Sequence, residues 1–228
     1  ALVEQKKYGD LELTDGRLSK IHEGDFIAGV LGERKALEGI VGVIPSNIKI
    51  GDTLCVLNLG GVIGKALSWN KEYVTSPLPV KIVGSIVDGE KIVNIHDFAP
   101  KLNSSLHKCA PIIAIIGTAM GVGKTTVATE VVHYLTKHKG LKVAAAKLTG
   151  VAAQRDILAM QDAGAVKALT FHDLGFTSTI QNHGIVIPAA KTILNQLNSY
   201  KPDCIIVELG DGLLGWYGVG TLLSDKDF

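Results

Sequence analysis

The sequence predicts an α/β fold in which a small all-β domain, a barrel or a sandwich, precedes a domain built on a parallel sheet. From residue 112 onward, short apolar runs alternate with segments of helical period, which is the pattern of βαβ units. Residues 10–99 instead carry short β-like runs separated by Gly, Asp and Asn, without a helical period. A polar stretch bounded by prolines lies between. We therefore expect domains at residues 1–99 and 112–228, joined by a linker at 100–111.

The clearest hairpin signal of the first domain is Asp88-Gly89, which joins expected strands at residues 80–87 and 90–95. A turn at residues 14–16 joins a second expected pair of strands. That pair covers residues 11–13 and 17–21, and further strands are expected at 25–31, 39–44, 53–57 and 62–67.

In the second domain, the wholly apolar run at residues 112–116 is typical of a central strand in a parallel sheet. Further strands are expected at 141–146, 166–171 and 204–207. A helix at 124–138 carries Val127, Val131 and Leu135 at helical spacing, and a short helix follows at 153–163. Pro188 is expected to open a last helix, with Ala189, Ile193 and Leu197 on one face.

Composition excludes several classes of partner. Lys and Arg number 23 against 22 Asp and Glu, so charge gives no argument for nucleic acid or an acidic membrane surface. No apolar run approaches the roughly 20 residues that span a bilayer. The three cysteines, Cys55, Cys109 and Cys204, are widely spaced, which favours a reducing compartment. We expect a cytoplasmic protein without nucleic acid or membrane partners, and a dimerising β domain would make it a homodimer.

A glycine-rich loop follows the run at residues 112–116 and opens the helix at 124–138. Glycines allow a tight turn that aims several backbone N–H groups at one anion, and a helix N-terminus adds partial positive charge. Lys124 would reach the β- and γ-phosphates of a nucleotide, and Thr125 would bind Mg²⁺. The sequence therefore predicts a P-loop that binds ATP with Mg²⁺. It consists of Gly117, Thr118, Ala119, Met120, Gly121, Val122, Gly123, Lys124, Thr125 and Thr126.

Gly117 lies one residue further from Gly123 than in the usual P-loop. This lengthened form resembles the dethiobiotin synthetase and cobyrinic acid a,c-diamide synthase family over residues 111–216. The resemblance implies that Lys147 contacts an acceptor carbamate and the transferring phosphate, and that Asp156 binds Mg²⁺. It also implies that Glu208, after an apolar strand, is the Walker B acid and a further Mg²⁺ ligand.

The chain departs from this family at several positions. Leu148 stands where the family has proline, and Leu209 and Asp211 stand where it has glycines. Asp211 is therefore an alternative metal ligand to Glu208. The family fold continues for several strands beyond the Walker B strand, so we expect the nucleotide-binding domain to be incomplete at its C-terminus. The first domain has no counterpart in dethiobiotin synthetase, which leaves the second substrate open.

Two hypotheses of function follow. The first is an ATP-dependent ligase, synthetase or NTP hydrolase that activates a carboxylate or carbamate, with a small carboxylate or amine as its second substrate. The alternative is a regulatory or chaperone-like NTPase whose β domain binds a partner. Phosphate release that depends on a small carboxylate or amine would favour the first, and slow hydrolysis stimulated by a protein would favour the second.

Overall fold

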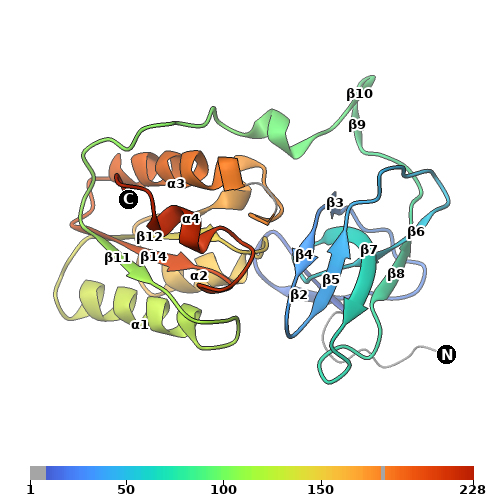
Figure 1. Ribbon diagram of the computed structural model, residues 1–228, viewed down its shortest axis with the longest axis horizontal. Helices are drawn as coiled ribbons and strands as arrows, with labels where there is room; N and C mark the ends of the chain where they lie inside the picture. The colour runs from blue at the N-terminus through green and yellow to red at the C-terminus, as the bar shows by residue number, and fades with distance from the viewer. Residues whose placement is uncertain (1–8, 181–182) are drawn as a thin grey trace. The chain divides into compact units, whose positions relative to one another are not determined.

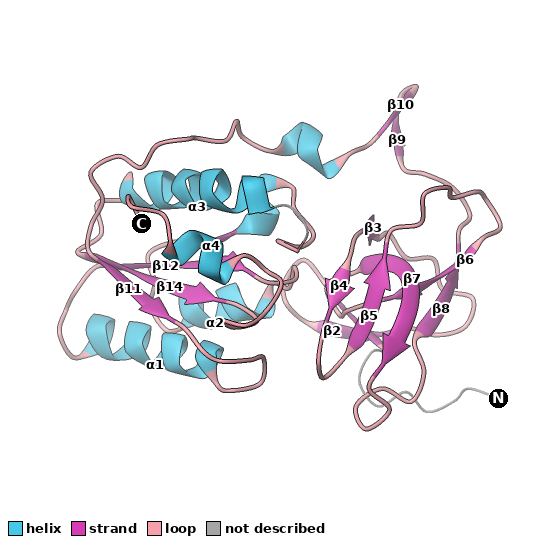
Figure 2. Ribbon diagram, viewed as in Figure 1, coloured by secondary structure: helices cyan, strands magenta, loops and turns pink. Residues whose placement is uncertain are grey.

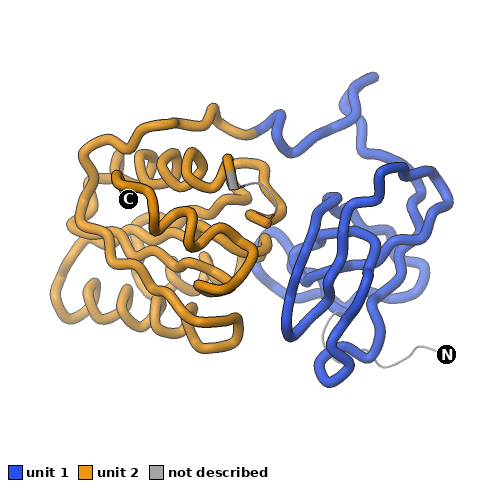
Figure 3. The backbone as a smooth tube through the Cα atoms, viewed as in Figure 1, with its two compact units in different colours: residues 1–98 blue, residues 99–228 orange. Residues whose placement is uncertain are grey.

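The computed structural model describes residues 9–180 and 183–228 and divides the chain into two compact units (Figure 3). The first unit is Ala1–Phe98 and the second is Ala99–Phe228. No helix within the described residues is both long and apolar enough to cross a membrane.

The first unit is built from strands, as expected, with one short 3-10 helix, η1 (Ile95–Phe98). Strands β4, β5, β7, β6 and β8 follow one another in its main sheet with antiparallel pairings, and β3 pairs with β7 in parallel. The strands are β1 (Asp10–Glu12), β2 (Leu18–Lys20), β3 (Val30–Leu31), β4 (Arg34–Lys35), β5 (Ile40–Val43), β6 (Thr53–Val56), β7 (Val62–Trp69), β8 (Leu78–Lys81), β9 (Val87–Asp88) and β10 (Lys91–Ile92).

The strand expected at residues 80–87 is split in two. Its start belongs to β8, which pairs with β6, whereas its end is β9, which forms a short hairpin with β10. The Asp88-Gly89 turn is present, and Gly89 has a φ of 61°. Val83 and Ile86, between the two strands, are 63% and 57% exposed, so no buried face holds the run together as one strand.

The second unit contains a four-stranded parallel sheet in the order β11, β14, β12, β13, which confirms the expected α/β class (Figures 1 and 2). Helices α1 and α2 cover one face, and α3 and α4 cover the other (Figure 1). The elements are β11 (Ile112–Ile115), α1 (Lys124–Lys137), β12 (Val143–Thr149), α2 (Arg155–Asp162), β13 (Ala168–Thr170), a 3-10 turn η2 (Phe171–Leu174), α3 (His183–Asn198), β14 (Cys204–Leu209) and α4 (Val219–Leu223).

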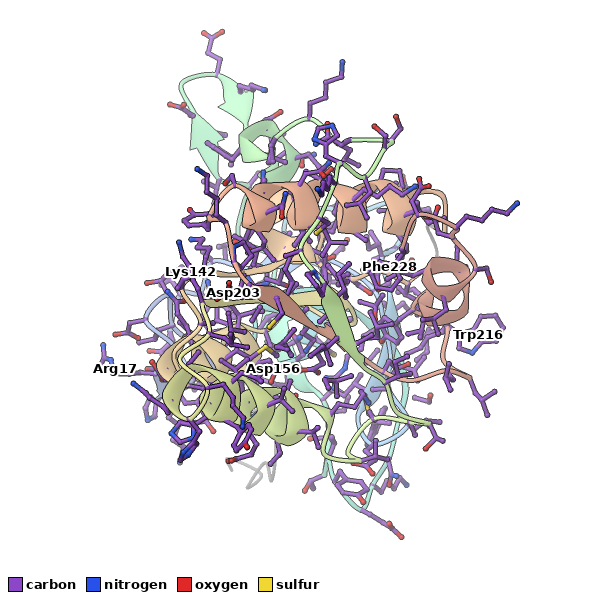
Figure 4. All side chains as sticks on the ribbon, turned by 90° about the vertical axis from the view of Figure 1, so that its left-hand side faces the viewer. Arg17, Lys142, Asp156, Asp203, Trp216 and Phe228 are labelled. Carbon is purple, nitrogen blue, oxygen red and sulfur yellow. The ribbon has the colours of Figure 1, made fainter. Side chains whose placement is uncertain are left out.

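Alternation along the two central strands explains the two faces. In β12, Ala144 and Ala146 pack toward α3 and α4, whereas Val143 and Ala145 pack toward α1 and α2. At the amino ends of β12 and β14, the Asp203 carboxylate accepts the Lys142 N–H at 2.7 Å (Figure 4). This bond helps to fix the register of the two strands.

The prediction that the strand at residues 112–116 lies in the centre of the sheet is wrong. Among the strands that the structure describes, β11 pairs with β14 alone and so lies at the edge of the sheet, and the central strands are β14 and β12. Ile113 of β11 is 41% exposed. An apolar run indicates two covered faces, but it does not determine how many strands lie beside it.

Two expectations about the helices are also corrected. The buried residues of α1 include Ala128 and Val132. Of the expected face, Val131 and Leu135 are partly buried against the same core, whereas Val127 is 49% exposed. The helical period predicts that one face is buried, but packing against the sheet decides the exact orientation of that face. Helix α3 begins at His183, so Pro188 lies inside it rather than at its start. Its expected face, Ala189, Ile193 and Leu197, is buried.

The segment expected to be a linker is attached to α3. Asn195 accepts a hydrogen bond from the His107 N–H at 2.9 Å and donates one to the Ser105 carbonyl at 3.0 Å. Asn198 makes the same pair of bonds with the Ala110 N–H and the Lys108 carbonyl. Residues 102–110, here called the strap, therefore belong to the second unit, and they lead directly into β11.

We predict that replacing both Asn195 and Asn198 by alanine lowers the free energy of unfolding of the second unit by about 1–3 kcal/mol, because four side-chain bonds to the strap are lost. The loss is expected despite the higher helix propensity of alanine. Urea unfolding followed by the helical circular dichroism signal measures it. Gln196→Ala on the same helix is the control, and a double variant as stable as that control would contradict the role of the strap.

Candidate functional site

The buried face of the sheet that packs against α1 and α2 carries charged side chains at its carboxyl end. Glu208 of β14 is in register with Ile115 of β11 on one side and Lys147 of β12 on the other. Along their strands, both residues continue the alternation that points toward α1 and α2. Glu208 is 3% exposed and Lys147 is 8% exposed. A carboxylate and an ammonium are thus neighbours at the carboxyl end of the sheet, where ligands bind in folds of this class.

Lys147 therefore lies inside β12 rather than just after it, because the strand runs to Thr149. The lysine forms an ion pair with Asp156, in the first turn of α2. The Arg155 guanidinium is a second, more distant partner of Asp156 at 3.7 Å. Since buried charges are costly unless paired, this ion pair explains how both side chains remain nearly covered.

Glu208 is only partly satisfied. Its Oε1 accepts a hydrogen bond from the Thr125 hydroxyl at 3.1 Å, but its Oε2 is buried without a partner among the described residues. Burial raises the pKa of Glu208, and the nearby Asp156 adds to this, while Lys147, Thr125 and Lys124 oppose it. A buried carboxylate oxygen without a donor is costly, which is a reason to expect a cation there when the site is filled.

Residues 117–126, here called the glycine loop, connect β11 to α1. Lys124 is 7% exposed, and its ammonium donates to the Ala119 carbonyl at 2.6 Å. Burial lowers the pKa of Lys124, while Glu208 and Asp211 oppose that effect. The left-handed φ values of Gly121 and Gly123, 77° and 86°, need glycine. Because no side chain caps the start of α1, its first N–H groups face the loop.

A second loop, residues 210–216 after β14, packs on the glycine loop. The Leu213 N–H donates to the Gly117 carbonyl at 3.0 Å. A Cβ on Gly212 would lie 2.5 Å from the Thr118 carbonyl oxygen and 2.7 Å from the Ala119 nitrogen, so only glycine fits. Sequence reasoning missed these contacts, because a glycine pair after a strand does not reveal which backbone it approaches.

The structure brings together five of the charged and hydroxyl residues that the sequence singled out, namely Lys124, Thr125, Lys147, Asp156 and Glu208. Thr125 contacts Glu208, Lys147 contacts Asp156, and Lys124 influences Glu208 through space. Among the other loop residues, Val122 is 52% exposed and its side chain covers the space where a Gly117 Cβ would lie. Met120 and Thr126 occupy the loop and the first turn of α1.

The residues present fit a small, hard cation. Thr125, Asp156 and Glu208 offer oxygen atoms, which Mg²⁺ prefers, and Glu208 has an oxygen without a donor. Within the described residues, no group of three or more His, Cys, Asp and Glu side chains could hold a metal by itself.

Comparison of the chain with models of known protein families and with curated proteins finds no match. What the site can do therefore follows from its own geometry. That geometry combines a helix N-terminus, two lysines and two carboxylates at the carboxyl end of a parallel sheet. Such an arrangement can hold an anion beside a cation.

We predict that Glu208→Gln stabilises the protein without added metal. The raised pKa of Glu208 means that its carboxylate disfavours the fold above the ordinary glutamate pKa of 4.5. Removing that charge should raise the free energy of unfolding at pH 7 by about 1–2 kcal/mol. The gain should disappear as the pH falls through 4.5, where the unfolded chain also binds the proton.

Thermal unfolding with EDTA between pH 4 and 8 measures this difference. Glu130→Gln, on the exposed side of α1, is the matched control. A Glu208→Gln protein that is less stable than wild type at pH 7 would show that the carboxylate is satisfied without a cation.

Proposed function

We propose that the glycine loop binds the phosphates of ATP with Mg²⁺, and that the protein is an ATP-dependent enzyme that activates a carboxylate or carbamate. The observation that carries this proposal is the buried Glu208, whose Oε2 has no partner while its Oε1 accepts from Thr125 at 3.1 Å. A carboxylate and a hydroxyl joined in this way at a helix start are what a Mg²⁺ ion beside bound phosphates requires.

The proposed phosphate contacts come from the backbone and from Lys124. The first N–H groups of α1 and the glycine loop would donate to the phosphates. The Lys124 ammonium, now on the Ala119 carbonyl, would turn to the β- and γ-phosphates. The lowered pKa of Lys124 would return toward the ordinary value, because a bound anion would replace part of the lost solvation.

Lys147 is the proposed contact for the acceptor. Its ammonium is paired with Asp156 in this structure, and Glu208 is its neighbour in register. Bound Mg²⁺ supplies positive charge that neutralises the transferring phosphoryl group. If Asp156 turned toward such a cation, Lys147 would be left to bind the acceptor carboxylate or carbamate. A buried lysine in this position favours an enzyme with an acceptor substrate over one that only hydrolyses ATP.

The experiment that tests this function measures phosphate release from Mg·ATP by the whole chain. The assay is run without a second substrate and then with small carboxylates, with amines, and with amines plus bicarbonate. The CO2 in equilibrium with bicarbonate forms carbamates with amines. Release that requires a carboxylate or carbamate supports the proposal. Release that requires only a protein partner would support the regulatory NTPase instead.

We predict that Lys124→Ala weakens ATP binding about 10- to 150-fold and abolishes turnover, because a charge-assisted phosphate contact contributes about 1.5–3 kcal/mol. Titration calorimetry with Mg·ATP measures the affinity, and Lys137→Ala at the other end of α1 is the control. A folded Lys124→Ala protein with unchanged affinity and turnover would overturn the assignment of the loop.

We predict that Asp156→Asn and Glu208→Gln each raise the Mg²⁺ concentration needed for half-maximal turnover by about tenfold or more, because each removes a negative charge that attracts a hard cation. Binding of ATP in EDTA should persist, since the backbone still holds the phosphates. Mg²⁺ titrations of activity separate the two residues. An unchanged requirement in Asp156→Asn would leave Asp156 only as the partner of Lys147.

A further inference from the structure

Three connecting segments meet at the carboxyl end of the sheet, beside Lys147. One follows β12 at residues 150–154, one precedes α3 at residues 175–180, and one follows β14 at residues 210–218. Thr179, in the segment before α3, is 2% exposed, and its side chain bonds to both of the other segments. A buried hydroxyl that joins the segments around a proposed acceptor contact can control the position of that contact.

The Thr179 hydroxyl is used both as an acceptor and as a donor. Its Oγ1 accepts a hydrogen bond from the Gly150 N–H at 3.0 Å and donates one to the Tyr217 carbonyl at 2.8 Å. The Thr179 N–H in turn donates to the Gly150 carbonyl at 3.0 Å. Both polar groups of the Gly150 backbone are therefore held by Thr179, and the segment after β14 is tied to the same point.

The side chain of Lys147 ends against the backbone of Gly150 and Gly210. A Cβ on Gly150 would lie 3.3 Å from the Lys147 Cε and 3.9 Å from its Nζ, and a Cβ on Gly210 would lie 3.2 Å from the Cε. The Thr149 hydroxyl donates to the Gly210 carbonyl at 2.9 Å. Two backbone segments that Thr149 and Thr179 hold in place thus form one wall of the space that the lysine occupies.

This wall limits where the Lys147 ammonium can point. Asp156 holds the ammonium from α2, and the two glycines bound the end of the side chain. A lysine has a flexible stem, so a shift of the Gly150 peptide would give it access to further rotamers. A misplacement of about 1 Å in a group that positions a substrate can slow a reaction about 100-fold.

We infer that Thr179 is a positioning residue, whose hydroxyl holds Gly150 against Lys147 and so keeps the ammonium where it would bind the acceptor carboxylate or carbamate. This inference rests on the proposed function. The glycine loop is held by other contacts, because Gly212 packs on the Thr118 peptide and the Leu213 N–H donates to the Gly117 carbonyl. Loss of the Thr179 hydroxyl should therefore affect the acceptor far more than ATP.

The test replaces Thr179 by valine, which has a similar shape without a hydroxyl, and by serine, which keeps the hydroxyl. Thr179→Ala is measured in parallel, in case the valine protein does not fold. Ser178→Ala is the matched control, because the Ser178 Oγ accepts from the Ile180 N–H at 3.1 Å within its own segment. Phosphate release is measured at saturating Mg·ATP against succinate, and against ammonium with bicarbonate as a source of carbamate.

The valine and alanine variants should lower kcat/KM for the acceptor about 10- to 100-fold, mainly through a higher acceptor KM, because Lys147 would bind the acceptor. The KM for Mg·ATP should stay within about twofold of wild type, and Thr179→Ser should restore most of the loss. Partial unfolding would instead lower kcat and leave the acceptor KM unchanged.

An unchanged acceptor KM in the folded valine or alanine protein would overturn the inference and leave the proposed function intact. An equal loss in the valine and serine proteins would do the same, because the hydroxyl would then not matter. Wild type whose phosphate release responds to no carboxylate or carbamate would overturn the proposed function itself, and this inference with it.

Discussion

Burial of Glu208 and Lys147 side by side, at the carboxyl end of the central strands, is the constraint on which the rest of the second unit depends. Taking such charges out of water costs several kcal/mol for each ion unless partners compensate. Those partners come from the starts of two helices, Thr125 of α1 and Asp156 of α2. The same contacts that satisfy the charges therefore bring the glycine loop and α2 to the end of the sheet.

Several polar groups at this site could bond to the proposed phosphates and cation. Within residues 9–180 and 183–228, the Oε2 atom of Glu208 has no donor and no side chain caps the start of α1. The Lys124 ammonium donates to a carbonyl of its own loop. The loop after β14 adds rigidity, because Gly212 and Leu213 hold the Thr118 peptide and Gly117 in place. A site organised in this way loses little freedom when an anion and a cation bind.

The alternation of strands and helices was predictable because apolar periodicity and glycine turns are local signals. In a parallel sheet the carboxyl ends of the strands then lie at one edge. Glu208 could be singled out in part for the same reason, since it ends an apolar strand, whereas Lys147 and Asp156 were singled out by the family resemblance. The edge position of β11, the buried Ala128 face of α1 and the contact of Gly212 with Thr118 could not, because they depend on which segments meet in space. The strap was misjudged similarly, since its backbone N–H and C=O groups bond to the side chains of Asn195 and Asn198, which lie 88 to 90 positions away in the sequence.

Hydrogen exchange of the whole chain, measured by mass spectrometry with and without Mg·ATP, tests the central claim most directly. Binding of the phosphates by backbone N–H groups should slow exchange in peptides that cover residues 117–126, and also at residues 210–213, which pack on that loop. Adenosine with Mg²⁺ should leave both segments unchanged, because it carries no phosphate. Exchange in residues 117–126 that is the same with and without saturating Mg·ATP would contradict the account.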